Sequence, residues 1–298
     1  MSLPTIQQLR WTSSTTFNAS TIITYNLSIG CSGLDLPLTY ELHRQFHALP
    51  TFTSIPIIDI MGKVTRDMPS FLPGFDPKRY PHVHAEQYLE MKRVLPRDGT
   101  LISEARVLDV INRKSGVAVI VAISTRDVDR DEAICYAEWT SFLIGMPGID
   151  ASKPSPRNTR PSTSLPNRPP DATSSHKTTP EQNALYRAAT GEWNPMHIDP
   201  GTAKAAGFPG PVLSGTCTIG IGVRHVIEHF ARGEVGRFRI VKSRLSKPVF
   251  PGEEVRTEMW RESGGRILYR QVGEDGRVVI SQAEVRLTDE EEGVSSQL

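Results

Sequence analysis

The chain has 298 residues, which is enough for two ordinary domains or for one large domain with a sizeable core. Its formal net charge of +1 argues against nucleic acid or an anionic membrane surface as a partner. Three cysteines without a C-x-x-C pair argue against a disulfide framework and against a structural zinc site. The sequence shows no secretory signal pattern and no apolar run of about eighteen residues. These features predict a soluble intracellular protein whose partner is a small molecule.

The first half of the chain reads mainly as strands. Threonine and isoleucine are abundant over 12–26 (TSSTTFNASTIITYN), a composition typical of strands. Three strand-like segments then follow one another at 95–110, 115–129 and 132–145, separated by glycines or charged turns. The next segment, 147–175, holds seven prolines, many serines and almost no large apolar residues, which predicts a linker or a long surface loop.

The second half begins with two predicted helices. In TTPEQNALYRAAT, Thr179 is a candidate N-cap, Pro180 suits the first helical position and Gln182 suits the capping-box position. We therefore expect a helix over about 180–190. A second, glycine-rich helix carries an apolar stripe suited to packing on a sheet, formed by Ile219, Val223, Val226, Ile227 and Phe230.

Three further strand-like segments, at 249–262, 265–274 and 276–287, repeat the plan of the first half after about 155 residues. A period of this length indicates two copies of one domain. Each copy is expected to be an antiparallel sheet with a helix laid against it, so the predicted fold class is α+β. The predicted division is a first repeat over 1–146, a linker over 147–175 and a second repeat over 176–298.

Candidate chemistry lies between the two predicted helices. The segment GEWNPMHIDP brings Glu192, Asn194 and His197 close together on backbone bracketed by Gly and Pro. A carboxylate and a neutral imidazole can share one water molecule and move its proton, which is general acid–base chemistry. Spacing alone leaves a second interpretation open, in which these side chains only satisfy nearby backbone groups.

The start of the glycine-rich helix offers complementary chemistry. A helix that begins near Ser214 and Gly215 presents unpaired N–H groups and the positive end of the helix dipole. Such donors can hold the oxygen of a polarised carbonyl group. Cys217 lies on the same turn and could act as a nucleophile, although a buried and packed thiol is the expectation for a free cysteine.

Several segments together resemble one known family. NRPPDA, NALYRAATGEWNPMHIDP, AGFPGPVLSGTCTIG and KPVFPGEEVRTEMW are similar to 2-enoyl-CoA hydratase 2, an (R)-specific hydratase within the wider MaoC-like family. The family pattern is roughly Tyr-Arg-x-Ser-Gly-Asp-x-Asn-Pro-Leu-His-x-Asp-Pro, followed by His-Gly-Leu-Cys-Thr. In the first half, VHAEQYLEMKRVLPRDGTL resembles a His-Gly-Glu-Gln-Tyr-Leu-Glu element of the family. The likeness extends from about residue 40 to residue 288.

The resemblance implies a double hot-dog fold, in which two hot-dog units of one chain pair with each other. The second unit would carry the catalytic pair, and the first would widen the pocket for a bulky acyl chain. The implied reaction is the reversible syn addition of water to a trans-2-enoyl-CoA, which gives a (3R)-3-hydroxyacyl-CoA. The acyl-CoA is then the substrate, and no cofactor and no metal are expected.

The resemblance also implies roles for individual residues. Glu192 and His197 would hold the water, and Asn194 would orient it. The Gly215 N–H would stabilise the enolate oxygen of the thioester. Substrate-binding roles are implied for Glu86, Ser214 and Asp199.

The chain departs from the family pattern at informative positions. The family's Asp is Glu192 here, its His is Ser214, and a Gly of the first half is Ala85. A displacement of about 1 Å can matter greatly in an oriented reaction, so these changes favour a specialised acyl chain, in fatty-acid or secondary metabolism. A hot-dog thioesterase and a non-catalytic acyl-thioester binding protein are the alternatives. Coenzyme A and acyl-carrier protein both remain possible carriers, because both present the same pantetheine arm.

Three other features need an interpretation. HVIEH, at 225–229, fits the H-x-x-E-H zinc-protease pattern, but its polar residues are predicted to lie away from the apolar stripe, so no zinc site is expected. The basic side chains Arg157, Arg160 and Arg168 of the linker could meet CoA phosphates or could simply be solvated. The final residues, SQL, resemble the Ser-Lys-Leu peroxisomal signal, so the predicted location is peroxisomal and otherwise cytoplasmic. A homodimer of double units is also expected.

Overall fold

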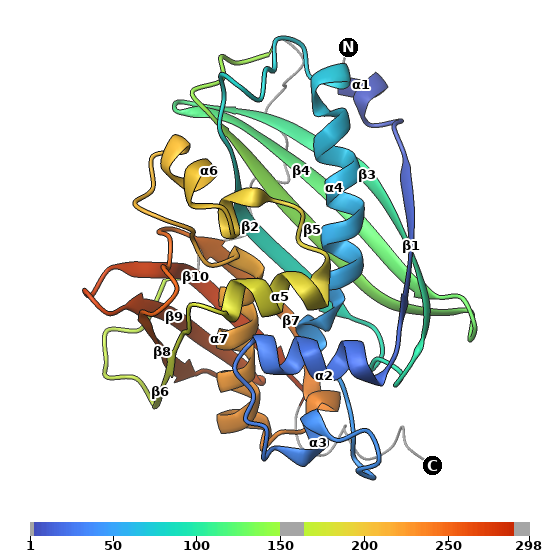
Figure 1. Cartoon of the computed structure of the whole chain (residues 1–298), viewed down its shortest axis with the longest axis vertical. Coiled ribbons are helices and arrows are strands. Elements are labelled where there is room, and N and C mark those ends of the chain that lie inside the picture. The colour runs from blue at the N-terminus through green and yellow to red at the C-terminus, as the bar shows by residue number, and fades with distance from the viewer. Residues whose placement is uncertain (1–2, 150–163, 289–298) are drawn as a thin grey trace.

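The structure is a computed structural model that describes residues 3–149 and 164–288 (Figure 1). Its ten strands form one sheet in the order β1-β3-β4-β5-β2-β7-β10-β9-β8-β6, and all neighbouring strands are antiparallel. The strands of the first half are β1 (Trp11–Phe17), β2 (His82–Met91), β3 (Gly99–Arg113), β4 (Gly116–Asp127) and β5 (Glu132–Ile144). Those of the second half are β6 (Ala172–Lys177), β7 (Phe238–Leu245), β8 (Glu254–Arg261), β9 (Arg266–Gly273) and β10 (Val278–Leu287).

The strand order confirms the duplication predicted from the sequence. Each half of the sheet contains five strands, and corresponding strands, such as β3 and β8 or β4 and β9, lie at mirrored places in the order. The halves meet where β2 pairs with β7, with Glu86 opposite Arg244 and Glu90 opposite Ile240. The two repeats therefore share one continuous sheet, as the sequence resemblance implied for a double hot-dog.

One long helix crosses each half of the sheet. In the first half, α4 (Ser54–Phe71) packs against β1 and β3, and in the second, α7 (Gly215–Ala231) packs against β7 and β10 (Figure 1). The predicted apolar stripe of α7 is buried throughout, which confirms that this face of the helix packs inward. The shorter helices are α1 (Leu3–Ile6), α2 (Ala19–Ser28), α3 (Leu36–Thr39), α5 (Gln182–Thr190) and α6 (Pro200–Ala205), with 3-10 turns η1 (Pro50–Thr53), η3 (Pro195–His197) and η4 (Val235–Arg237).

Two predicted segments differ from the structure. The region 12–26 is not strand throughout, because β1 ends at Phe17 and the side chain of Asn18 accepts a hydrogen bond from the N–H of Thr21, which starts α2. The helix predicted over 180–190 begins later, at Gln182, after an N-cap at Glu181. A side-chain cap therefore sets the start of α2, whereas Glu181 makes no side-chain capping bond at the start of α5.

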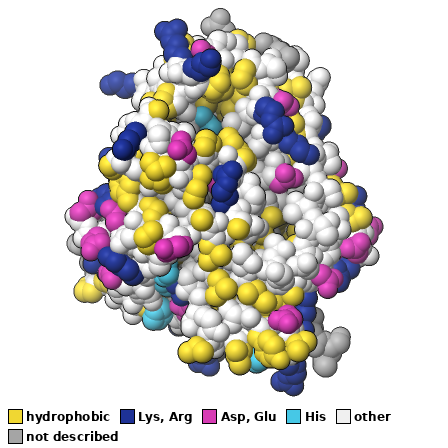
Figure 2. Space-filling model, viewed as in Figure 1, with side chains coloured by type: hydrophobic (Ala, Val, Ile, Leu, Met, Phe, Trp, Pro, Cys, Tyr) yellow, Lys and Arg dark blue, Asp and Glu magenta, His cyan; other side chains and the backbone are white. Residues whose placement is uncertain are grey.

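The linker prediction needs a correction at its end. β6 begins at Ala172 and pairs with β8, so this strand crosses the predicted boundary at residue 176. Residues 150–163 of the expected linker, with Arg157 and Arg160, lie outside the described residues. The described helices include none long and apolar enough to cross a membrane. On the face shown in Figure 2, acidic and basic side chains are interspersed rather than segregated.

Candidate active site

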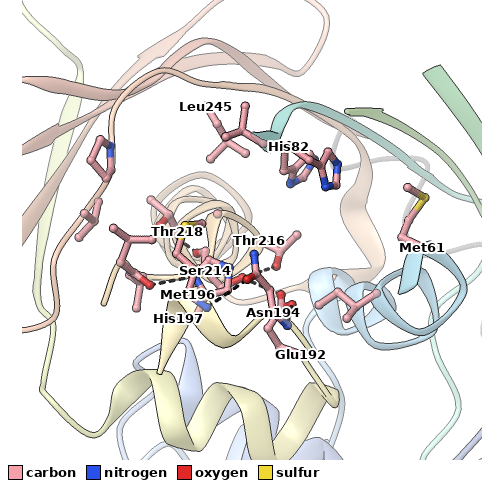
Figure 3. Close-up of a pocket in the computed structure, with 18 of the residues that line it drawn as sticks. Met61, His82, Glu192, Asn194, Met196, His197, Ser214, Thr216, Thr218 and Leu245 are labelled. Carbon is pink, nitrogen blue, oxygen red and sulfur yellow. Dashed lines mark hydrogen bonds between the residues drawn. The ribbon is translucent and has the colours of Figure 1, made fainter. Parts of the chain in front are cut away.

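A cavity of about 320 Å³ lies between α4 and the N-terminal end of α7. Both repeats line it: Ile58 and Met61 come from α4, whereas Leu213 and Leu245 come from the second repeat. Its volume is at the lower end of the range of roughly 300–1,000 Å³ typical of small-molecule sites. The cavity includes Glu192, Asn194, His197, Ser214 and Gly215, so the structure brings the predicted catalytic residues together (Figure 3).

Glu192 is held on both of its carboxylate oxygens. The side chain is only 7% exposed, so it needs hydrogen-bond partners. One oxygen accepts the backbone N–H of Asn194 at 3.1 Å, and the other accepts the Ser214 hydroxyl at 3.3 Å. The guanidinium of Arg187 also donates to the Glu192 backbone carbonyl. The carboxylate is thus fixed in place while it remains on the cavity wall.

His197 has a defined tautomer. Its Nδ1 lies 2.9 Å from the carbonyl oxygen of Val212, which can only accept, so Nδ1 carries the proton. The other nitrogen, Nε2, consequently holds a lone pair that can accept a proton. His197 also lines a second cavity of about 420 Å³, formed with Pro180, Asn183, Pro209, Pro211 and Phe250. The imidazole therefore stands between two cavities.

Asn194 shapes the turn that presents His197. Its side-chain oxygen accepts the N–H of Met196 at 3.0 Å and caps the 3-10 turn η3. Pro195 occupies the first position of that turn, where no N–H is required. The Asn194 side chain thus helps to position the histidine and also lines the cavity itself.

Gly215 starts α7 beside the carboxylate. Among the described residues, its N–H has no hydrogen-bond partner, as expected for the first residue of a helix. A Cβ at this position would lie 2.8 Å from a methyl carbon of Leu245, so the backbone approaches the wall more closely than other residues allow. The amide is therefore available to a ligand.

A chain of buried hydroxyl groups leads to the Glu192 carboxylate. Tyr186 donates to Thr216 at 2.9 Å, the Thr216 and Ser214 hydroxyls are 3.0 Å apart, and Ser54 lies 3.1 Å from the Tyr186 hydroxyl. Because Ser214 donates to Glu192, all four hydroxyls can point in one direction, toward the carboxylate. Burial raises the pKa of Tyr186, which keeps its hydroxyl protonated. The chain connects α4 of the first repeat with the catalytic segment of the second.

Two residues with predicted substrate-binding roles lie outside the cavity that contains Glu192. Glu86 lies on the outer face of the sheet, 3.8 Å from Arg244, and not in the cavity with Glu192. The cause is a bulge between His84 and Glu86, which puts these two residues on opposite faces. Asp199 is exposed and caps α6, where it accepts the N–H groups of Gly201 and Thr202. The Thr202 hydroxyl, together with these N–H groups, lowers the pKa of Asp199.

The other candidate residues from the sequence, His225, Cys217 and Arg168, make structural contacts. His225 is buried and bonds Thr257 at 2.8 Å, which corrects the expectation that it lies away from the apolar stripe. Burial raises the pKa of Cys217, so the packed-thiol interpretation is confirmed. Arg168 pairs with Asp171 and Glu262. Within 3–149 and 164–288, no group of three or more His, Cys, Asp or Glu side chains could hold a metal ion.

Sequence reasoning missed which residues of the first repeat line the cavity. His82, His84 and Trp139 line the same cavity as Glu192, from strands β2 and β5. The signal was present as His-x-His, because alternate residues of a strand face the same side. What concealed it was the neighbouring bulge, which changes the alternation after His84.

Known families match both repeats. Residues 15–145 match the MFE-2 hydratase 2 N-terminal domain, and residues 161–283 match the MaoC like domain. The chain is 39% identical over 92% of its length to the peroxisomal multifunctional enzyme type 2 of Mus musculus. It spans only 30% to 46% of the length of such multifunctional enzymes from three organisms. It is 33% identical to the peroxisomal enoyl-CoA hydratase 2 of Arabidopsis thaliana, over 89% of each chain.

Solved structures agree with these matches. A MaoC-like dehydratase from Phytophthora capsici superposes with a TM-score of 0.85, at 28% identity over 100% of both chains. A Mycobacterium tuberculosis protein described as a double hot-dog fold has a TM-score of 0.60 at 15% identity, over 94% of each chain, and shows the same fold. The cavity with its buried carboxylate, the paired repeats and these matches lead to one conclusion: the chain belongs to the enoyl-CoA hydratase 2 family of MaoC-like proteins.

Proposed function

We propose that the protein catalyses the reversible hydration of a trans-2-enoyl-CoA to a (3R)-3-hydroxyacyl-CoA. The observation that carries this proposal is the meeting of Glu192, His197 and the free Gly215 amide on one cavity wall. A carboxylate and an imidazole can move the proton of water, and an amide donor can hold a developing oxyanion. The names of the similar proteins support the same reaction.

The proposed addition balances without any outside proton. Water lies between the Glu192 carboxylate and Nε2 of His197, and its oxygen forms the bond to C3. One of the two groups removes a water proton during this attack, and the pair returns a proton to C2. Because both new bonds form from the same side, the addition is syn.

The negative charge that develops on the thioester oxygen is assigned to the Gly215 N–H. This donor is preorganised by the helix that begins there, and the helix dipole adds a partial positive charge.

The two cavities beside His197 suggest how the substrate lies. The acyl chain occupies the cavity shared with Ile58 and Met61, and the pantetheine arm occupies the one lined by Pro209, Pro211 and Phe250.

Loss of absorbance of the conjugated thioester tests the reaction directly. Glu192→Gln and His197→Ala are each expected to abolish hydration while the thermal unfolding temperature stays close to that of the wild type. The product should be the 3R enantiomer. Wild-type rates in either variant would refute the assignment, and release of free CoA thiol from the acyl-CoA would indicate a thioesterase instead.

We also propose a peroxisomal location, because similar proteins are named as peroxisomal. The SQL residues lie outside the described part of the chain. Microscopy of an N-terminally fluorescent fusion, with and without Leu298, tests this location, and a cytosolic signal from the full sequence would contradict it. The expected homodimer stays a prediction, which sedimentation measurements can decide.

A further inference from the structure

Two histidines of the first repeat lie in the active-site cavity but have no part in the proposed addition of water. His82 and His84 occupy the inner face of β2, so both side chains line the cavity. Figure 3 shows His82 across the cavity from Glu192 and Asn194. These imidazoles belong to the wall that the acyl chain would meet.

Each imidazole is fixed through one ring nitrogen. Nε2 of His82 lies 2.8 Å from the hydroxyl oxygen of Ser141, and Nε2 of His84 lies 3.1 Å from the backbone carbonyl of Glu86. The His84 ring also stacks on Trp139, with centroids 3.4 Å apart and planes 7° from parallel. Both rings are therefore held in one orientation before any ligand arrives.

The second ring nitrogen of each histidine is unused. Among the described residues, Nδ1 of His82 and Nδ1 of His84 have no hydrogen-bond partner. Because the Glu86 carbonyl can only accept, His84 carries its proton on Nε2 and leaves a lone pair on Nδ1. That lone pair can accept a hydrogen bond, from water or from a donor group of the ligand.

The chemistry of these groups favours a neutral ligand group over a carboxylate. Burial lowers the pKa of His82 to about 4 and that of His84 to about 3, so both rings are neutral at physiological pH. Neutral rings do not attract a carboxylate. A ketone offers only an acceptor, which does not satisfy the lone pair of His84, whereas a hydroxyl group both donates and accepts.

We propose that His82 and His84 form a subsite that binds a hydroxyl group on the acyl chain of the substrate. The preferred substrate is then a 2-enoyl thioester whose chain carries a hydroxyl beyond the double bond. This inference rests on the proposed function, since that function places the acyl chain in this cavity. An unsubstituted alkyl chain would exclude water from the His84 lone pair without replacing its hydrogen bond, which disfavours such a chain.

Binding of unreactive analogues tests the subsite independently of catalysis. S-alkyl-CoA thioethers of four, six and eight carbons are each compared with the thioether that carries a terminal hydroxyl, by calorimetry on the wild-type protein. We expect the hydroxylated analogue to bind about tenfold more tightly at one of these lengths. Equal affinities, or a preference for the plain alkyl chain at every length, would overturn the proposal.

Variants identify the residues that bind the hydroxyl. His84→Phe keeps the stacking on Trp139 but lacks the ring nitrogen, so the preference for the hydroxyl should disappear. His84→Gln, which retains a donor and an acceptor, should restore part of the preference for the hydroxyl. If His84→Phe does not fold, His82→Phe replaces it in the same comparison. Glu86→Gln is the matched control, because its side chain lies on the outer face of the same strand and the change should leave the affinity ratio unchanged.

Three results are distinguishable. If His84→Phe weakens both analogues equally, the histidines bind the pantetheine arm and the proposal is wrong. If neither affinity changes in His84→Phe relative to the wild type, the rings are merely structural, which also refutes it. If the hydroxyl preference follows the histidines but no enoyl-CoA is hydrated, the subsite stands and the proposed function fails.

Discussion

The hydroxyl of Ser214 donates a hydrogen bond to the carboxylate of Glu192 across 3.3 Å, where the family pattern has a histidine and an aspartate. Glu192 is longer than the family's aspartate and Ser214 is smaller than its histidine, so the two changes compensate each other in size. A hydrogen bond to a charged group contributes about 1.5–3 kcal/mol.

Ser214→Ala should accordingly lower kcat by about tenfold to a hundredfold, because the carboxylate loses one of its two fixing contacts. KM should change little, since the hydroxyl acts on the acid. Steady-state kinetics with an enoyl-CoA measures both constants. Glu86→Gln, on the outer face of the sheet, is the control and should retain wild-type kcat. An unchanged kcat in Ser214→Ala would show that Glu192 does not depend on this contact.

The hydroxyl chain behind Ser214 should act as one unit. Thr216→Val removes the donor to Ser214, and Tyr186→Phe removes the donor to Thr216, so each is expected to lower kcat by about threefold to tenfold. A double-mutant cycle of Thr216→Val with Ser214→Ala should be clearly non-additive. Thr216→Ser, which keeps the hydroxyl, should restore most of the activity. Additive effects would mean that the two hydroxyls act separately.

Gly215→Ala should impair catalysis through Leu245. The new methyl group would lie 2.8 Å from the leucine side chain, so the start of α7 must shift or the leucine must move. A loss of kcat of about tenfold is expected, in line with the sensitivity of oxyanion donors to position. Adding Leu245→Ala should recover part of it. No recovery in the double variant would place the defect elsewhere.

Buried histidines should make the protein sensitive to acid. Burial lowers the pKa of His82 to about 4 and those of His84 and His225 to about 3. In the unfolded chain these groups titrate near about pH 6.5, so below that pH the unfolded state binds protons that the folded state does not. The free energy of unfolding should therefore fall between about pH 6 and pH 4, by about 1.4 kcal/mol per pH unit for each histidine.

Urea unfolding at a series of pH values measures this slope. Of the three histidines, only His225 lies outside the active-site cavity, and His225→Asn removes it. The slope of the unfolding free energy against pH should then be smaller by the contribution of one histidine. His229→Asn is the matched control, because His229 is exposed on the same helix. Equal slopes for His225→Asn and the wild type would show that His225 does not remain neutral in the folded state.

The sequence predicted the elements whose patterns are local. Six strand segments followed from alternating residues and turns, and α7 followed from an apolar stripe. Glu192, His197 and Gly215 were candidates from local spacing and the start of a helix, and the family resemblance implied their catalytic roles. The positions of Glu86 and Asp199 could not be predicted from the sequence. A single bulge decides which face of the sheet Glu86 occupies, and the Asp199 carboxylate is engaged in capping α6.

Long-range contacts were the least accessible to sequence reasoning. Ser54 and Tyr186 are 132 positions apart in the chain, yet their hydroxyls join one hydrogen-bonded chain. Likewise, Ser214 and Thr216 stand where the family pattern has His and Leu, but only the structure shows that they bond each other. Such partners become neighbours only after the two repeats have packed.

The pairing of β2 with β7 makes each repeat depend on the other. A fragment of either repeat would end in a strand whose backbone N–H and C=O groups have lost their partners, and such an edge recruits strands from other molecules. Because both units belong to one polypeptide, the matching edge is available at any protein concentration. The pairing also brings the strand that carries His82 and His84 against the second repeat, so one cavity is lined by side chains of both units.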